Sequence, residues 1–196
     1  MGAPRIAVLL TALIAGGCAL NEDFPARWSS PVLGGCAALS GTYSNAGEAG
    51  ELHVVAPPGT DLRPRLALRF FDYEQGKNDR WDALRRADRV ILAYSDGVLN
   101  VDVRDGTNSV ATARFSLAAK TLTCTREGAA IPGYSGWAHG AGNPLIGREF
   151  NEDLLMPAAD GSLIVKYTGR STGMVYGVMP FSGSSVSWLR WPRQGA

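Results

Sequence analysis

Apolar residues recur at every second position through the middle of this chain, and this alternation constrains the fold more than any other feature. Segments 90–95 and 98–104 both alternate in this way, and they flank the pair Asp96-Gly97. An Asp-Gly pair supplies the positive φ angles that a tight two-residue turn requires. The sequence therefore predicts an antiparallel β-hairpin at this place.

The same period predicts further short strands separated by turn residues. They are expected at 51–55, 65–71, 110–117, 120–126, 161–168, 173–181 and 184–191. Residues 78–88 depart from the alternation, because Asn78 is a good cap and the apolar residues that follow have helical spacing. The pattern indicates an all-β fold with one short helix. We expect an antiparallel meander that forms a small barrel or a sandwich, and a lipocalin-like barrel is the specific version by analogy of strand spacing.

The first residues are typical of a bacterial export signal. Arg5 precedes the apolar run 6–15, and two glycines then lead into Cys18. A membrane-spanning helix needs about 20 apolar residues, roughly twice this run. A cysteine directly after small residues is the pattern of a lipoprotein signal, so we predict a signal peptide over 1–17 and palmitate-type acylation at Cys18. An ordinary signal peptide, cut nearby without lipidation, is the alternative.

The predicted signal also sets the domain organisation and the compartment. Residues 18–35 are rich in Pro, Gly and Ser and predict a lipid-anchored tether, and residues 36–196 predict a single β-domain. Ala19, and not Asp, follows the lipidated cysteine. By resemblance to the enterobacterial sorting pattern, this favours the periplasmic face of the outer membrane. A soluble periplasmic or secreted protein is the alternative.

The two remaining cysteines, Cys36 and Cys124, are an even number in an oxidising compartment. We predict that they form a disulfide bond, with two buried free thiols as the alternative. Neither cysteine has a second cysteine or a histidine at metal-ligand spacing. The sequence accordingly predicts no metal site and no cofactor.

A short motif after the tether has a counterpart in other proteins. It reads Cys-x-x-Leu-Ser-Gly-x-Tyr-x-Asn-x-Gly and begins at Cys36. Together with segment 160–166 and the Trp-rich segment 186–191, it resembles small uncharacterised lipoproteins of Gram-negative bacteria. The resemblance covers three short segments and implies no known activity.

Charge and motifs exclude several functions. The formal net charge is +1, which gives no electrostatic basis for binding nucleic acid. Residues 169–173 match the Gly-x-Ser-x-Gly pattern of a nucleophile elbow, but no histidine follows Ser171 as that arrangement needs. We predict a hairpin turn there, and the sequence offers no catalytic constellation.

One segment is a candidate site. Residues 132–148 combine aromatic residues with Gly, Ser and Asn, and predict a long loop. Its candidate ligand or partner residues are Tyr134, Trp137, His139 and Asn143. In the alternative, the aromatic residues only close one end of the fold.

Three functions follow as hypotheses. The first is an exported, lipid-anchored binding or structural module that meets the membrane through its N-terminal lipid and an envelope protein or small ligand through its domain. The second is a carrier of a small apolar ligand inside a barrel. The third is an envelope hydrolase, for which His139 or a carboxylate pair would be needed.

Overall fold

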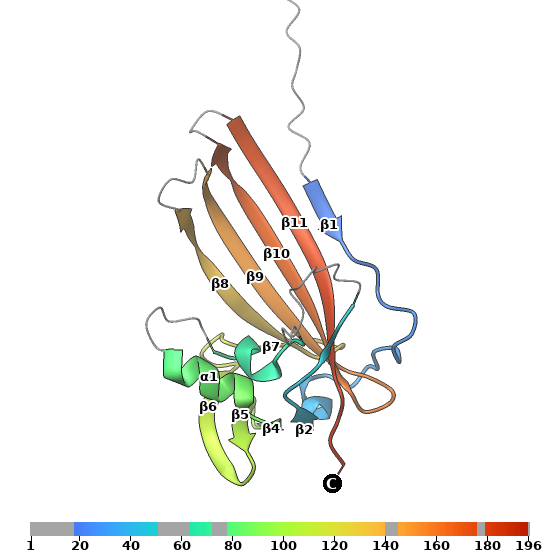
Figure 1. Ribbon diagram of the computed structural model, residues 1–196. Helices are drawn as coiled ribbons and strands as arrows, with labels where there is room; N and C mark the ends of the chain where they lie inside the picture. The colour runs from blue at the N-terminus through green and yellow to red at the C-terminus, as the bar shows by residue number, and fades with distance from the viewer. Residues whose placement is uncertain (1–17, 51–62, 72–77, 140–144, 176–178, 196) are drawn as a thin grey trace, which may run out of the picture.

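The computed structural model describes residues 18–50, 63–71, 78–139, 145–175 and 179–195 (Figure 1). Its short elements are β1 (Cys18–Asn21), the 3-10 helix η1 (Cys36–Leu39), β2 (Gly41–Ser44), β3 (Glu48–Ala49), the 3-10 helix η2 (Leu66–Arg69), α1 (Asn78–Arg86) and β7 (Thr123–Cys124). Its longer strands are β4 (Arg89–Ser95), β5 (Val98–Asp105), β6 (Asn108–Ser116), β8 (Ala129–His139), β9 (Leu145–Pro157), β10 (Leu163–Val175) and β11 (Met179–Trp191).

The strands form two sheets. The larger has the order β1-β11-β10-β9-β8-β7, with β3 also paired to β11, and the smaller has the order β2-β4-β5-β6. Neighbouring strands are antiparallel except for β1, which runs parallel to β11. The all-β antiparallel fold with one short helix is confirmed. Neither sheet closes into a barrel within the described residues, so the barrel version of the expectation, including the lipocalin-like one, is not realised.

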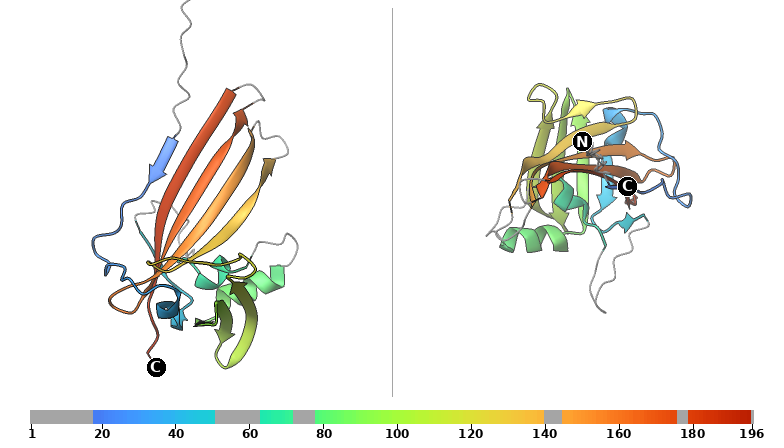
Figure 2. Two further views of the ribbon diagram at one scale, coloured as in Figure 1. Left: turned by 180° about the vertical axis from the view of Figure 1, so that it is seen from behind. Right: turned by 90° about the horizontal axis from the view of Figure 1, so that it is seen from above.

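The hydrophobic core lies where the two sheets meet. Strands β8 to β11 pack one end of their length over the smaller sheet and α1, and their other end extends well beyond it (Figures 1 and 2). Both sheets contribute fully buried side chains to this core, including Val90, Leu99, Leu155, Leu163 and Trp191. We call the packed end the proximal half of the long sheet. The distal half consists of residues 145–151 of β9, 169–175 of β10 and 179–185 of β11.

The predicted hairpin and helix are both present. Asp96 has φ 50° and Gly97 has φ 76°, as the turn between β4 and β5 requires. Helix α1 begins at Asn78, and Leu84 on its apolar stripe is buried in the core. The hairpin could be predicted because its turn chemistry is local, and the helix because its apolar residues have helical spacing.

The motif that begins at Cys36 joins the short elements around the core. The hydroxyl of Tyr43 donates to the carbonyl of Leu39 at 2.9 Å. Asn45 is fully buried, and its Nδ2 donates to the carbonyls of Leu84 (2.8 Å) and Ala87 (2.9 Å) at the end of α1. Its Oδ1 accepts from the backbone amide of Ala67 at 2.8 Å. One buried amide side chain thus joins β2, η2 and α1.

The predicted disulfide between Cys36 and Cys124 is present, with a sequence separation of 88 residues and a Cα–Cα distance of 5.6 Å. It links η1 to β7, at the edge of the long sheet. The segment predicted as a free tether also contacts the domain. Trp28 is 5% exposed, and Phe24 packs edge-on against Trp188 of β11 at 5.1 Å between ring centroids.

Several strand boundaries were predicted wrongly. Residues 66–69 form η2, because Leu66, Ala67 and Phe70 are all buried, whereas a strand would expose the middle one. Only Thr123–Cys124 of the segment 120–126 is a strand. The segment predicted at 51–55 lies outside the described residues.

Two further predictions fail in the long sheet. The residues predicted to turn at 169–173 are the middle of β10. The loop predicted over 132–148 consists largely of β8 and β9, with residues 140–144 outside the described part. Within the described residues, no helix has the length and apolar character to cross a membrane.

Candidate functional site

The two faces of the long sheet can be followed by its strand register. Leu163 and Val165 of β10 face the main core, and Tyr167, Gly169, Ser171 and Gly173 continue the same face by the period of two. The residues that pair with them from β9 and β11 share that face, which we call the inner face. In the distal half, the paired positions on this face are Gly147, Glu149, Asn151, Phe181, Gly183 and Ser185.

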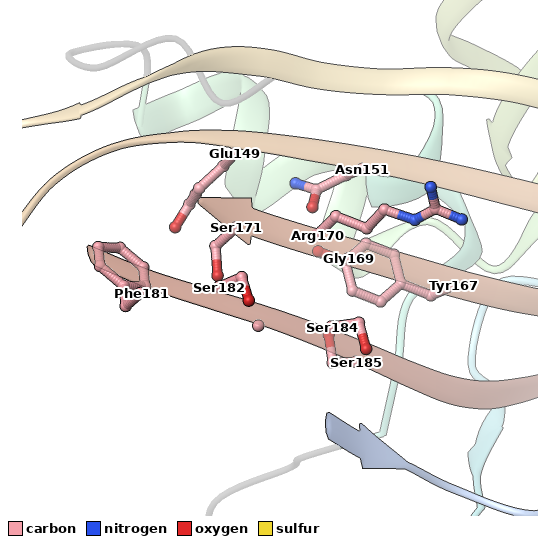
Figure 3. Close-up of a pocket in the computed structure, with 11 residues that line it drawn as sticks. Glu149, Asn151, Tyr167, Gly169, Arg170, Ser171, Phe181, Ser182, Ser184 and Ser185 are labelled. Carbon is pink, nitrogen blue, oxygen red and sulfur yellow. The ribbon is translucent and has the colours of Figure 1, made fainter. Parts of the chain in front are cut away.

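The inner face therefore changes character halfway along. Large apolar side chains fill the proximal half, whereas glycine and serine predominate in the distal half. The result is a trough of about 450 Å³ that is open to solvent (Figure 3). Its lining residues are Glu149, Asn151, Tyr167, Gly169, Arg170, Ser171, Phe181, Ser182, Gly183, Ser184 and Ser185.

Phe181 closes one end of the trough by lying across two glycines. A Cβ atom on Gly173 would stand 2.7 Å from Cε1 of Phe181, and one on Gly147 would stand 3.2 Å from its Cζ. Any larger residue at Gly173 would also meet the backbone oxygen of Ile146 at 2.3 Å. These glycines are thus required by the close packing of three strands. The match to Gly-x-Ser-x-Gly at 169–173 therefore reflects strand packing within β10, and not a nucleophile elbow.

A partly buried ion pair lies at the other end of the trough, where the core begins. Nε of Arg69, from η2, donates to Oδ2 of Asp153 at 2.8 Å, and its Nη2 donates to Oδ1. The guanidinium carbon of Arg69 also stands 4.8 Å from the ring centroid of Tyr167. Tyr167 therefore presents its ring between the trough and a fixed positive charge.

Burial governs the titration of this end. Asp153 is 7% exposed, and its burial raises the pKa of its carboxyl even though Arg69 acts to lower it. Burial likewise raises the pKa of the Tyr167 phenol, so its hydroxyl stays protonated at neutral pH. Glu149, by contrast, is exposed on the trough wall. The trough thus offers hydroxyl groups, an amide and one accessible carboxylate beside two aromatic rings.

A second hollow lies on the opposite face of the distal half. It is lined by Pro132, Gly133, Ser135, Phe150, Asn151, Glu152, Thr168 and Arg170. Phe150 is 43% exposed there. Arg170 and Asn151 line both the trough and this second hollow, so the two hollows lie back to back across the single layer of the sheet.

The sequence-predicted residues take up different positions. The register places Cys18 of β1 opposite Gly183, beside the trough. Trp137 and His139 lie on β8, opposite Arg148 and Ile146, and not on a loop. Tyr134 lies in the irregular stretch of β8 where the register shifts, and Asn143 lies outside the described residues.

Sequence reasoning missed the residues that shape the trough, namely Phe181, Tyr167, Arg69 and Asp153. The sequence did contain a signal for the trough, namely the glycines at 147, 169, 173 and 183. They share the inner face with serines, at positions where a strand that covers a core would carry apolar residues.

The described lining of the trough contains hydroxyl groups, an amide, a carboxylate and a guanidinium group, and no histidine. No group of three or more His, Cys, Asp or Glu side chains in the described part of the chain is placed to hold a metal ion. Ser171 lies in the trough, but His53 and His139 are both outside the side chains that the structure describes.

Comparison with known proteins did not assign the chain to a family. The sequence matches no protein-family model, and searches of curated proteins and of solved structures found no significant match.

Proposed function

We propose that this protein is an exported, lipid-anchored binding module of the bacterial cell envelope, and that the trough is its binding surface. One observation carries the proposal. The long sheet continues for several residues past its core, and there its inner face is shaped by small residues into a hollow. A sheet face that no described residue covers gains little stability from burial, so a role in binding is the reason to retain it.

The lining favours a particular ligand chemistry. Phe181 and Tyr167 supply aromatic faces at the two ends, and Asn151, Ser171 and Glu149 supply donors and acceptors between them. Sugar rings present apolar faces together with hydroxyl groups, and they suit such a mixed surface. An envelope glycan is therefore the ligand class that we propose. A carrier of small apolar molecules is less well supported, because the trough is open and the sheets are not closed.

The anchor belongs to the same proposal. Cys18 is the first residue of β1, and removal of residues 1–17 would leave every described element intact. A lipid on Cys18 would hold the long sheet beside a membrane, which we propose to be the outer membrane at its periplasmic face. Intact mass tests this, since a diacylglyceryl adduct is expected on the purified chain. An unmodified Cys18 would contradict the anchor.

The trough is tested with soluble cell-wall glycan fragments titrated into the isotope-labelled chain. We expect amide shifts that are largest at Ser171 and Gly183, and we expect Ser171→Trp to abolish them by filling the hollow. Thr112→Trp is the matched control, because Thr112 is an exposed mid-strand hydroxyl residue on β6 of the other sheet. Shifts that survive Ser171→Trp, or that are lost equally in both variants, would contradict the proposal.

A further inference from the structure

The far end of the distal half is apolar on both faces. Met179 is 61% exposed, Met174 is 48% exposed and Ile146 is 46% exposed. The register joins these residues across three strands, because Ile146 is paired with Met174, Met174 with Pro180, and Val175 with Met179. We call these five residues the apolar tip. Residues 145–147, 173–175 and 179–183 of this end contain no charged side chain.

The predicted lipid attachment residue stands just below this tip. Cys18 is opposite Gly183 on β11. Met179 precedes Gly183 by four residues, so it lies about 13 Å nearer the free end of the sheet at the rise of a β-strand. Figure 1 shows β1 alongside β11 near the same free end of the sheet. The apolar tip therefore projects past the level of Cys18, away from the packed part of the molecule.

Two exposed arginines flank that level, and the exposed carboxylate of Glu149 lies on it, because Glu149 is paired with Ser171. Gly183 is paired with Ser171 on β10, and Arg170 directly precedes Ser171 on that strand. Arg148 of β9 is paired with Thr172, one residue to the other side of Ser171. Cationic side chains at the height of a lipid anchor suit the phosphate groups of a bilayer surface.

We propose that the apolar tip inserts into the bilayer that carries the lipid of Cys18, with Arg148 and Arg170 at the level of the lipid phosphates. This inference rests on the proposed function, because it takes the lipid on Cys18 as given. Interfacial protein segments bury their apolar side chains roughly 5–10 Å deep. The two rungs of the apolar tip lie about 10 and 13 Å past the level of Cys18, so the tip would reach slightly deeper than that, to the start of the lipid chains. A tip that is apolar on both faces suits lipid, which surrounds it, better than a protein partner, which would cover one face.

The insertion would fix the orientation of the whole protein. The long sheet would stand upright on the membrane, with the packed proximal half pointing away from it (Figure 2). The trough, which reaches from Phe181 down to Tyr167, would then open at the membrane surface. The structure thus gives the tip a positioning role for the binding surface.

The test uses the lipidated full chain in vesicles of phosphatidylethanolamine and phosphatidylglycerol with mid-chain brominated lipid as quencher. A Met179→Cys variant carries an environment-sensitive fluorophore on its single free thiol, since Cys36 and Cys124 are joined and Cys18 holds the lipid. Leu117→Cys is the control, because Leu117 is a 40% exposed apolar residue following β6, far from the tip. We expect roughly twofold quenching at residue 179 and none at residue 117.

The outcomes separate this inference from the anchor. A label at residue 179 that stays unquenched, while the protein floats with the vesicles, would overturn tip insertion and leave the anchor intact. A label that self-quenches with rising protein density and ignores bromine would also overturn it, because the tip would then meet a second copy of the chain. Protein that does not float and carries no lipid mass would instead refute the proposed anchor. A second variant, Met174→Asp with the label at residue 179, should still float but lose the quenching.

Discussion

Strands β9, β10 and β11 run through both halves of the long sheet, and the two halves differ in what covers their faces. In the proximal half, consecutive residues Leu163, Ile164 and Val165 of β10 are all buried, because the core covers one face and the N-terminal segment covers the other. In the distal half, Ser171 and Met174 of the same strand are partly or largely exposed.

The difference shows that strand pairing and core packing are separate requirements. The distal half keeps a continuous backbone register from Gly169 to Val175 with both neighbours. The backbone pairing of the distal half thus continues that of the proximal half, where the core supplies the stability. The side chains of the distal half can then form a binding surface. Substitutions should affect folding in one half and binding in the other.

The largest effect is expected from removing the disulfide. A Cys36→Ser/Cys124→Ser variant should lose about 4 kcal/mol of unfolding free energy, because a loop of 88 residues is no longer closed in the unfolded chain. Urea denaturation measures the loss. A loss well below 1 kcal/mol would mean that the proximal half does not depend on this link.

The next effect is expected at Asn45. Replacement by Ala leaves the carbonyls of Leu84 and Ala87 and the amide of Ala67 without their buried partner, so we expect a loss of about 3 kcal/mol. Asn100→Ala, on the exposed side of β5, is the control and should stay within about 0.5 kcal/mol of the parent chain. Equal losses at the two sites would break the comparison.

The sequence predicted the smaller sheet and α1 better than the distal half of the long sheet, and the reason is physical. Alternation of apolar residues arises where a strand covers a core, as β5 does with Leu99, Val101 and Val103. The hairpin, the helix and the disulfide were predicted correctly because each depends on local chemistry or on counting cysteines. The distal half contributes no residue to the core clusters of the described chain, and its Gly- and Ser-rich sequence has the composition of a turn or loop.

Two errors illustrate the limit. Residues 169–173 were predicted as a turn because glycine is common in turns, whereas here Gly169 and Gly173 make room for Ser185 and Phe181 on the neighbouring strand. The strand predicted over 65–71 is η2, because the buried set there is decided by α1 and Asn45, which are distant in sequence. Neither contact is visible in a local pattern.

A smaller effect is expected at the boundary between the halves. Arg69→Met leaves the buried carboxylate of Asp153 without its partner, and we expect a loss of about 2 kcal/mol at pH 7, since Arg69 is partly solvated. Arg104→Met is the control, because Arg104 forms an ion pair with Asp102 that is more exposed, and its loss should be under about 1 kcal/mol.

The pH dependence of the Arg69→Met variant gives a sharper test of the same pair. The pKa of Asp153 is raised in the folded state, so the folded chain binds its proton more tightly than the unfolded chain does. Stability from this group therefore rises as pH falls through the folded pKa toward the unfolded value of 3.8. Arg69→Met raises the folded pKa further, so its deficit should shrink between neutral pH and mild acid. A deficit that is constant with pH would show that the carboxylate is not the cause.

The smallest effect on folding, together with a clear loss of binding, is expected at Phe181. Its ring covers Gly173 and Gly147, and Phe181 is not one of the described residues of the main core, so Phe181→Ala should cost less than about 1 kcal/mol. Leu163→Ala, ten rungs away on the inner face of the adjoining strand, should cost about 3 kcal/mol because it opens a cavity in the core.

Glycan titration of both variants completes the test. Phe181→Ala should weaken binding by roughly tenfold, as expected for a lost ring contact, whereas folded Leu163→Ala should bind like the parent chain. A Phe181→Ala chain that unfolds as readily as Leu163→Ala would show that the distal half is part of the folding core, and the division between the two halves would no longer hold.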